Sequence, residues 1–219
     1  MAYNRNSALE LHKDYSENQK NWEMFIRSFN GGYDYTLGQY LNRYNLELDN
    51  EFNQRLANTP CDNHCKNIIQ IYSSFLFREK ASRDFGSMSE EPSLQTFLKD
   101  ADLEGNSFNT VMKTAQNYAS IYGHCFMILD KPNIQTATRA EELNQEIRPY
   151  VSIVTPENVF DWNFERQPNG KYILNYLKIR EEVDRKGGSY MRIWYPDKVD
   201  TIYVEDERTE PTLIDTAEN

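Results

Sequence analysis

The sequence has little cysteine, little histidine and a deficit of positive charge, and each shortage excludes a class of protein. Its three cysteines are too few, and odd in number, for a disulfide framework, so a reducing compartment is expected. Lysine and arginine total 24 against 34 aspartates and glutamates, which gives a formal charge of -10. Because affinity for duplex DNA comes mainly from Lys and Arg contacts to phosphates, this balance argues against a protein that grips nucleic acid.

Long apolar runs are also missing. No stretch of about 18 apolar residues occurs, and the first residues, MAYNRNSALELHKDY, lack the apolar centre of a secretory signal. The sequence therefore predicts a soluble, intracellular protein with no membrane partner. Aromatic residues, by contrast, make up 13% of the chain, while the mean hydropathy is -0.80. That mixture suits large amphipathic contact surfaces.

Motifs for nucleotide or metal chemistry are absent from the sequence. Neither G-x-x-x-x-G-K-[ST] nor G-x-G-x-x-G is present, so the glycine pairs are interpreted as turns. Cys61, His64 and Cys65 are close together, but both cysteines fall on the apolar stripe of a predicted helix, and no second ligand pair has zinc spacing. Neither His12 nor His124 offers a cysteine an oriented base. We expect core cysteines rather than a metal site or a catalytic dyad.

Carboxylates near predicted strand ends are the remaining chemical candidates. Asp130, Glu157 and Asp161 can in principle support nuclease or glycosidase chemistry. No D-x-D or E-x-K pair on adjacent strands brings a divalent ion and a base together, and an acidic surface supplies such residues by chance. We therefore predict no enzyme activity, no catalytic residue, no metal ligand and no cofactor. A metal-dependent hydrolase stays open as the weakest alternative.

The first half of the chain has the apolar spacing of helices. Ser16–Gln19 has the form of a capping box. The apolar stripe that follows, at i, i+3, i+4 and i+7, consists of Trp22, Phe25, Ile26 and Phe29. Gly31 and Gly32 are expected to end this helix. A second helix is indicated by apolar residues four apart and by one i, i+4 ion pair, namely Leu48, Phe52 and Leu56 and the pair Glu51 and Arg55.

A third helix is predicted to begin at Thr59–Pro60, with threonine as the N-cap and proline in the first position. Its apolar stripe, interpreted as a core face, consists of Cys61, Cys65, Ile68, Ile69, Tyr72, Phe75 and Leu76. Two more helices are expected, a short one over residues 94–101 and a longer one that starts near Ser107 and is capped by Gly123.

After Gly123 the apolar spacing changes to that of strands. Residues 124–129 indicate a buried strand, and residues 133–147 a polar insertion. Five more strands joined by turns are expected at 149–154, 159–162, 172–180, 190–195 and 199–204. The predicted fold class is therefore α+β, with N-terminal helices followed by an antiparallel β meander. We divide the chain into a mainly helical part at 1–123, a β-rich part at 124–205 and an acidic loop or truncated continuation at 206–219.

Several short motifs, taken in order, resemble the N-terminal region of tailed-bacteriophage portal proteins. The first set is Gly38-x-Tyr40-Leu41-x-Arg43, Glu51, Arg55-Leu56, Asn63-x-x-Lys66-x-Ile68-Ile69 and Phe77-Arg78. The second is Tyr118-x-x-x-Tyr122-Gly123 followed by the strand up to Asp130-Lys131-Pro132. The third is Arg148-Pro149-Tyr150-Val151, Pro156-Glu157-Asn158-Val159 and Asp161-Trp162. The resemblance spans residues 33–205, and its weight comes from the order and spacing of the motifs.

The resemblance implies the wing of a portal, a head-tail connector that forms a ring, usually a dodecamer, at one capsid vertex. Through that channel the viral genome is packaged and later ejected, which requires no active site. The implied partners are other copies of the chain, the major capsid protein, the terminase and head-tail adaptor proteins. DNA passes without sequence-specific binding, and an acidic wall that repels phosphate agrees with this role. The protein is expected in the virion, after assembly in the host cytoplasm.

Two points stay open at the sequence level. The long stem helix, clip and crown of a portal have no counterpart before residue 219, so we expect the chain to be the N-terminal half of a portal. A head-tail adaptor or another virion subunit shares the acidic, aromatic-rich composition, and only the ordered motifs favour a portal over it. A metal-dependent phage hydrolase is less favoured than either.

Overall fold

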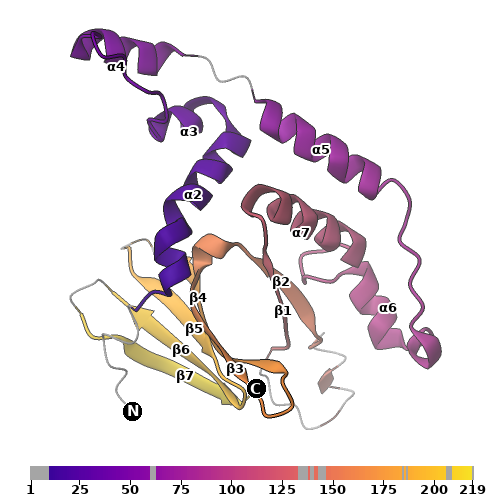
Figure 1. Ribbon diagram of the computed structural model, residues 1–219. Helices are drawn as coiled ribbons and strands as arrows, with labels where there is room; N and C mark the ends of the chain where they lie inside the picture. Colours follow the sequence, from indigo (N-terminus) through magenta and orange to yellow (C-terminus); the bar gives the residue numbers. More distant parts are fainter. Residues whose placement is uncertain are drawn as a thin grey trace. The chain divides into compact units, whose positions relative to one another are not determined.

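The computed structural model describes residues 10–59, 63–132, 138, 141–142, 147–183, 185, 187–205 and 209–218 (Figure 1). Its helices are α2 (Lys13–Asn30), α3 (Gly32–Leu37), α4 (Asp49–Asn58), α5 (His64–Leu76), α6 (Pro92–Lys99) and α7 (Phe108–Tyr122), with short 3-10 turns at Gly86–Met88 and Pro156–Asn158. Its strands are β1 (Phe126–Asp130), β2 (Tyr150–Val154), β3 (Val159–Arg166), β4 (Tyr172–Val183), β5 (Ser189–Trp194), β6 (Lys198–Val204) and β7 (Thr212–Glu218). Helices come first and an antiparallel sheet last, which confirms the predicted α+β class.

Contacts divide the chain into two compact units. One contains the chain up to Gln19 together with residues 154–219, and so includes the five-stranded sheet. The other, residues 20–153, contains α3 to α7 and nearly all of the two-stranded sheet of β1 and β2. None of the helices in the described ranges is long and apolar enough to cross a membrane.

The five-stranded sheet is a meander in which each strand pairs antiparallel with the next one along the chain. Strand alternation places Met191 and Ile193 of β5 on the same face as Ile202 and Val204 of β6, and these buried side chains form the core of the unit. The turn between β3 and β4 contains Gly170 with φ +83, a conformation that glycine adopts without strain. The strands predicted at 159–162, 172–180, 190–195 and 199–204 are therefore confirmed.

The C-terminal segment contradicts the prediction of a loop. Residues Thr212–Glu218 form β7, which pairs antiparallel with β6. The strand was missed because its two large apolar residues, Leu213 and Ile214, are adjacent and so do not alternate with polar residues. Both side chains are exposed in the structure. Backbone pairing to the edge of the sheet holds it instead. The hydroxyl of Thr216 also donates to the buried carboxylate of Asp200 at 2.8 Å.

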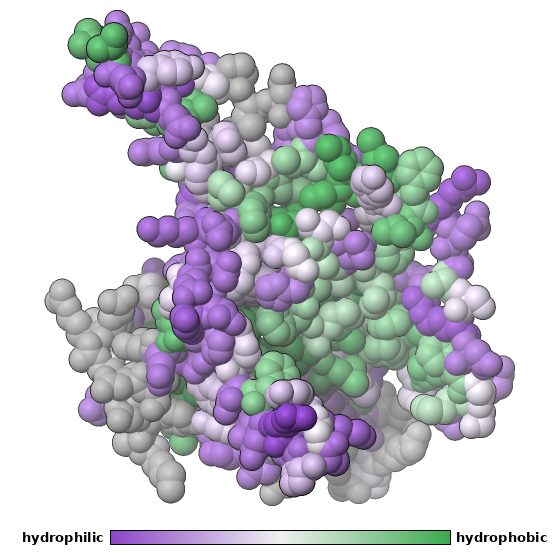
Figure 2. Space-filling view, viewed as in Figure 1, coloured by the Kyte–Doolittle hydropathy of each residue, from purple (hydrophilic) through white to green (hydrophobic). Residues whose placement is uncertain are grey.

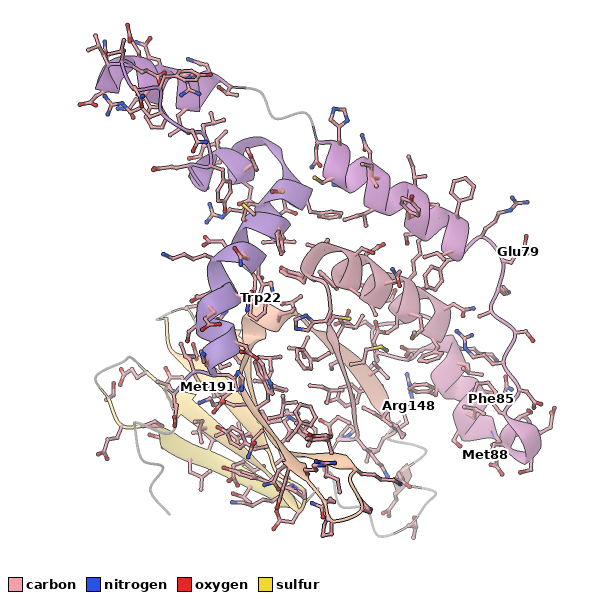
Figure 3. The ribbon with its side chains drawn as sticks, in the orientation of Figure 1. Trp22, Glu79, Phe85, Met88, Arg148 and Met191 are labelled. Carbon is pink, nitrogen blue, oxygen red and sulfur yellow. The ribbon has the colours of Figure 1, made fainter. Side chains whose placement is uncertain are left out.

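Helix α2 begins three residues before the predicted cap. The Ser16 hydroxyl donates to the backbone carbonyl of His12, so Ser16 lies in the first turn and is no N-cap. Gly31 and Gly32 have φ of +69 and +57 and end the helix as predicted. Of the predicted stripe, only Trp22 is buried (Figure 3); Phe25 is exposed, and the other two side chains are half-buried.

The start predicted for the third helix is wrong. Thr59 closes α4, because its backbone N–H donates to the carbonyl of Arg55. Residues 60–62 lie outside the described residues, and α5 begins at His64 after Asn63, whose side chain accepts a hydrogen bond from the Lys66 backbone N–H. Asparagine is a strong N-cap residue, so the local signal was present in the sequence.

Helix α7 follows the prediction at both ends. The Ser107 side chain caps its N-terminus, and Gly123, in the left-handed conformation, caps its C-terminus. Val111 of this helix packs with Ala101 and with Val151 of β2 in the core of the second unit. The predicted polar insertion at 133–147 lies mostly outside the described residues.

Candidate functional site

One face of helix α5 is apolar and exposed among the described residues of the second unit. Five large apolar side chains on it are each more than half exposed: Ile68, Ile71, Tyr72, Phe75 and Leu76. Their spacing of three and four residues places them on one stripe of the helix. Figure 2 shows hydrophobic atoms gathered over α5. We call these five residues the α5 face.

The α5 face is exposed because the helix packs through a different side. Helices α5 and α7 lie in contact, and the only residue of α5 that is fully buried is Ser73. Ser73 lies on the side of the helix that also carries Ile69 and Phe77, both half-buried. The sequence therefore predicted four of the five residues of the α5 face, missing Ile71, but assigned them to a core, whereas five of the seven residues of the predicted stripe, Cys65 among them, are exposed.

Two buried polar atoms lie on the contacting helices α5 and α7. Within the described part of the chain, neither the Ser73 hydroxyl nor the Asn117 side-chain carbonyl of α7 has a hydrogen-bond partner. An unpaired buried polar group costs about 1 to 3 kcal/mol. Helix α5 therefore buries a serine and exposes its apolar stripe, the reverse of what stabilises an amphipathic helix within one chain.

A second uncovered apolar surface precedes α5. Residues 33–58, which we call the arm, contain most of α3 and all of α4, and neither helix has a buried residue. Five apolar side chains of the arm are more than half exposed, namely Tyr33, Leu37, Tyr44, Leu46 and Leu48. Apolar patches of this kind on soluble proteins commonly mark interaction sites.

Polar contacts around Arg55 hold the arm together. The Arg55 guanidinium donates to both carboxylate oxygens of Glu47, at 2.8 and 2.9 Å, and to the carbonyl of Asn42 at 2.7 Å. It also lies over the rings of Tyr44 and Phe52, 4.7 and 5.4 Å from their centroids. The hydrogen bonds from Arg55 lower the pKa of Glu47 to about 2. The i, i+4 pair predicted for Arg55 with Glu51 does not form, because Glu51 caps α4 by accepting from the Leu48 N–H.

The arm and α5 differ in charge. The arm carries four acidic side chains, Asp34, Glu47, Asp49 and Glu51, and two basic ones, Arg43 and Arg55. Residues 63–78, which comprise α5 and its ends, carry no acidic side chain and contain Lys66 and Arg78, both exposed. The arm therefore has a formal excess of two acidic side chains, whereas Arg78 at the end of the α5 segment is paired with the adjacent Glu79 at 3.8 Å.

The structure describes only some of the residues weighed for metal or cysteine chemistry. His64 and Cys65 are both exposed on α5, and Cys61 lies outside the described residues. Among the residues that the structure describes, no group of three His, Cys, Asp or Glu side chains can hold a metal ion. Burial against the rings of Trp22 and Phe126 lowers the pKa of His124, which suits a packed imidazole.

The carboxylates near strand ends also lie in separate settings. Asp130 accepts a hydrogen bond from the Tyr150 hydroxyl at 3.0 Å, within the second unit. Asp161 lies 4.0 Å from the ammonium of Lys178, within the first unit. Glu157 is half-buried there, and its backbone carbonyl accepts from the Tyr15 hydroxyl. Each of these three residues therefore makes its contact within its own unit.

Sequence reasoning missed a buried lysine. Lys178 of β4 is fully buried and donates to the backbone carbonyl of Glu10. Burial lowers its pKa, while Asp161 and Glu10 act in the opposite direction. Burial and the same aspartate raise the pKa of Tyr176. Strand alternation put Lys178 on the core face, but nothing in the sequence distinguished it from a surface lysine.

A hollow of about 550 Å³ lies between α6 and the start of β2. Its charged lining is internally paired: Arg148, labelled in Figure 3, binds Asp100, and Lys131 binds Glu142. Lys99 also lines it. Ion pairs of this kind neutralise the wall, which therefore presents no concentrated charge to a ligand. We assign the candidate function to the two apolar surfaces.

No protein-family model matches the sequence, and no curated protein sequence matches it.

Proposed function

We propose that this chain is a structural subunit of a tailed-phage portal ring, at the capsid vertex where the genome is packaged and ejected. The observation that carries the proposal is the pair of uncovered apolar surfaces, the α5 face and the arm, on a chain whose described residues form no metal cluster. A protein of this kind functions through contacts with other subunits.

The order of the portal-like motifs is the reason that we propose a portal rather than another virion subunit. Two of these motifs are joined in the fold, because the Tyr150 hydroxyl of the RPY segment donates to Asp130 of the LDKP segment. Within the second of these motifs, the helix that ends at Gly123 leads into β1 after a left-handed cap. The second motif and the start of the third therefore lie together in the second unit.

The acidic balance supports a role beside moving DNA. A formal charge of -10 repels phosphates, so a wall of such subunits lets DNA slide without sequence-specific binding. The partners proposed are further copies of the chain, the major capsid protein, the terminase and the head-tail adaptor proteins. The chain is proposed to act in the virion after assembly in the host cytoplasm, without a catalytic step.

Native mass spectrometry and electron microscopy of the purified protein test this proposal. A closed ring of portal size, usually a dodecamer, with a central hole is the expected result. A monomer or a small open oligomer would overturn it in favour of a head-tail adaptor. Metal-dependent hydrolysis by the purified protein would overturn the non-enzymatic part.

A further inference from the structure

We propose that residues 10–15 form a strap that closes over one edge of the five-stranded sheet, and that the buried Lys178 is the positioning residue that holds the strap shut. The strap and the sheet belong to the same unit of the chain. This device is independent of the portal proposal, because it operates within one unit of one chain.

Strand β3 forms one edge of the sheet, and its pairing with β4 is irregular near its start. The register between the two strands shifts between Val159 and Asp161, on either side of Phe160, as at a β-bulge. The carbonyl of Phe160 accepts a hydrogen bond from the backbone N–H of His12 at 2.9 Å. The strap therefore covers the edge at its irregular point, as loops commonly do at sheet edges that would otherwise be open to another chain.

Two ring contacts seat the strap on the same strand. The His12 ring stacks on the Trp162 ring, with centroids 4.0 Å apart and an angle of 18° between the planes. The Tyr15 ring meets the Phe160 ring edge-on at 5.2 Å, and its hydroxyl donates to the backbone carbonyl of Glu157 at 3.1 Å. Aromatic pairs have preferred geometries, so these contacts fix where the strap lies along β3.

Lys178 binds the strap from the buried side of the sheet. It pairs with Ile193 of β5 across the ladder and shares the buried face of that residue. Its side chain is fully buried, and its ammonium donates to the backbone carbonyl of Glu10. Asp161, 4.0 Å away, supplies a negative charge that favours the ammonium.

The contribution of Lys178 is to position the strap rather than to stabilise the sheet. A buried ammonium loses its hydration, so an apolar side chain of the same length is often at least as favourable for stability at such a site. What an apolar side chain cannot supply is a donor for the carbonyl of Glu10. The lysine therefore selects the placement of the chain in which this carbonyl meets the ammonium.

The strap can open without unfolding of the sheet, because little of the strap is buried. Tyr15 is its one buried residue. Four of the other residues are exposed, namely Glu10, Leu11, Lys13 and Asp14. Segments with few buried contacts open at a lower free energy than the cores to which they attach. An open strap would uncover Lys178 and the start of β3.

Hydrogen exchange of the full chain at neutral pH, measured by mass spectrometry, tests the role of Lys178 with the variant Lys178→Met. Methionine keeps the apolar stem and removes the donor to Glu10. Asp161 keeps the hydrogen bond that it accepts from the Trp162 N–H at 3.0 Å, so the sheet is expected to stay folded. Lys171→Met is the matched control, because Lys171 is exposed in the turn between β3 and β4.

In Lys178→Met the amides of His12 and Asp14 should exchange at least about tenfold faster than in the wild-type protein, because a hydrogen bond to a charged donor is lost. The amides of β5 and β6 should change by less than about twofold, since their core is untouched. The Lys171→Met control should match the wild-type protein in both regions.

Acetylation by acetic anhydride, located by peptide mass spectrometry, measures opening of the strap in a second way. In the wild-type protein Lys178 should react at least about tenfold more slowly than the exposed Lys171, because the reagent reaches it only when the strap is open. Tyr15→Phe keeps the ring and removes the hydroxyl that donates to Glu157. It should speed the reaction of Lys178 and leave that of Lys171 unchanged.

Three results would overturn the inference. Unchanged exchange of the strap in Lys178→Met would show that Lys178 does not hold it. Exchange that rises equally in the strap and in β5 and β6 would show that the strap is part of the core of the sheet. If Lys178→Met does not fold, Tyr15→Phe decides: a reaction of Lys178 at the wild-type rate would show that the strap does not control access to it.

Discussion

The arm and the five-stranded sheet are held together by different forces. The sheet has a core of side chains that are almost completely buried, among them Ile193 and Ile202. The two helices of the arm have no buried residue, and Arg55 ties α4 to the segment before it by donating to Asn42 and Glu47. Hydrophobic burial is worth several times more per residue than an exposed polar network. A region held in the second way keeps its apolar side chains available for a partner.

The largest effect is expected in the sheet. Ile202→Ala should lower the free energy of unfolding by about 4 kcal/mol, because Ile202 has no exposed surface and the cavity cannot collapse. The matched substitution on α5 is Ile71→Ala, at a residue that is 55% exposed, and it should cost less than about 0.5 kcal/mol. Urea unfolding at low protein concentration, where subunits are apart, measures both. Equal costs would show that the α5 face is covered within the chain.

The second largest loss of stability is expected at Trp22 on helix α2, which precedes the arm. Trp22→Ala should cost about 3 kcal/mol or more, since the indole is 6% exposed and meets the His124 ring edge-on at a centroid distance of 5.8 Å. The control is Phe25→Ala on the same helix, an exposed position that should cost under about 1 kcal/mol. Thermal or urea unfolding compares the two. A cost under about 1 kcal/mol for Trp22→Ala, with assembly unaffected, would reject its placement in a core.

A smaller, local effect is expected within the arm. Arg55→Ala removes the donor to Glu47 and the cation above Tyr44, so the arm amides should exchange faster with solvent while those of the sheet are unchanged. Arg78→Ala is the control, because Arg78 lies outside the arm and its side chain is 74% exposed beside Glu79. Hydrogen exchange read by mass spectrometry resolves the two regions. Faster exchange throughout the sheet in Arg55→Ala would mean that the arm and sheet are one cooperative unit.

The sequence predicted the sheet better than the arm and α5, and the reason is physical. In β5 and β6 each apolar side chain on the inner face is covered by the neighbouring strand of the same meander, so periodicity and burial agree. On α5 the same reasoning found the stripe but assigned it to a core, because periodicity shows which residues share a face and not what covers it. The sequence could therefore predict that these residues share one side of the helix, but not that this side is exposed.

Two further failures have local causes. The strand β7 was missed because backbone pairing at a sheet edge needs no apolar pattern. The partner of Arg55 was missed because Glu47 lies eight residues away, outside helix α4, where helical spacing gives no guide. A sequence without catalytic motifs also gave no positive signal for a site, so the candidate surfaces became visible only once burial was known.

The smallest expected effect is a dependence of the arm's order on pH, which the sheet should not share. The pKa of Glu47 in the folded chain is about 2, below its ordinary value of 4.5, so the unfolded arm binds the proton more readily than the folded arm does. Order in the arm should therefore be full above about pH 5 and be lost as the pH falls from 4.5 toward 2. Hydrogen exchange of the arm across this range measures the loss, and Glu47→Gln should remove the dependence. A pH profile in Glu47→Gln that matches the wild-type protein would show that another carboxylate controls the arm.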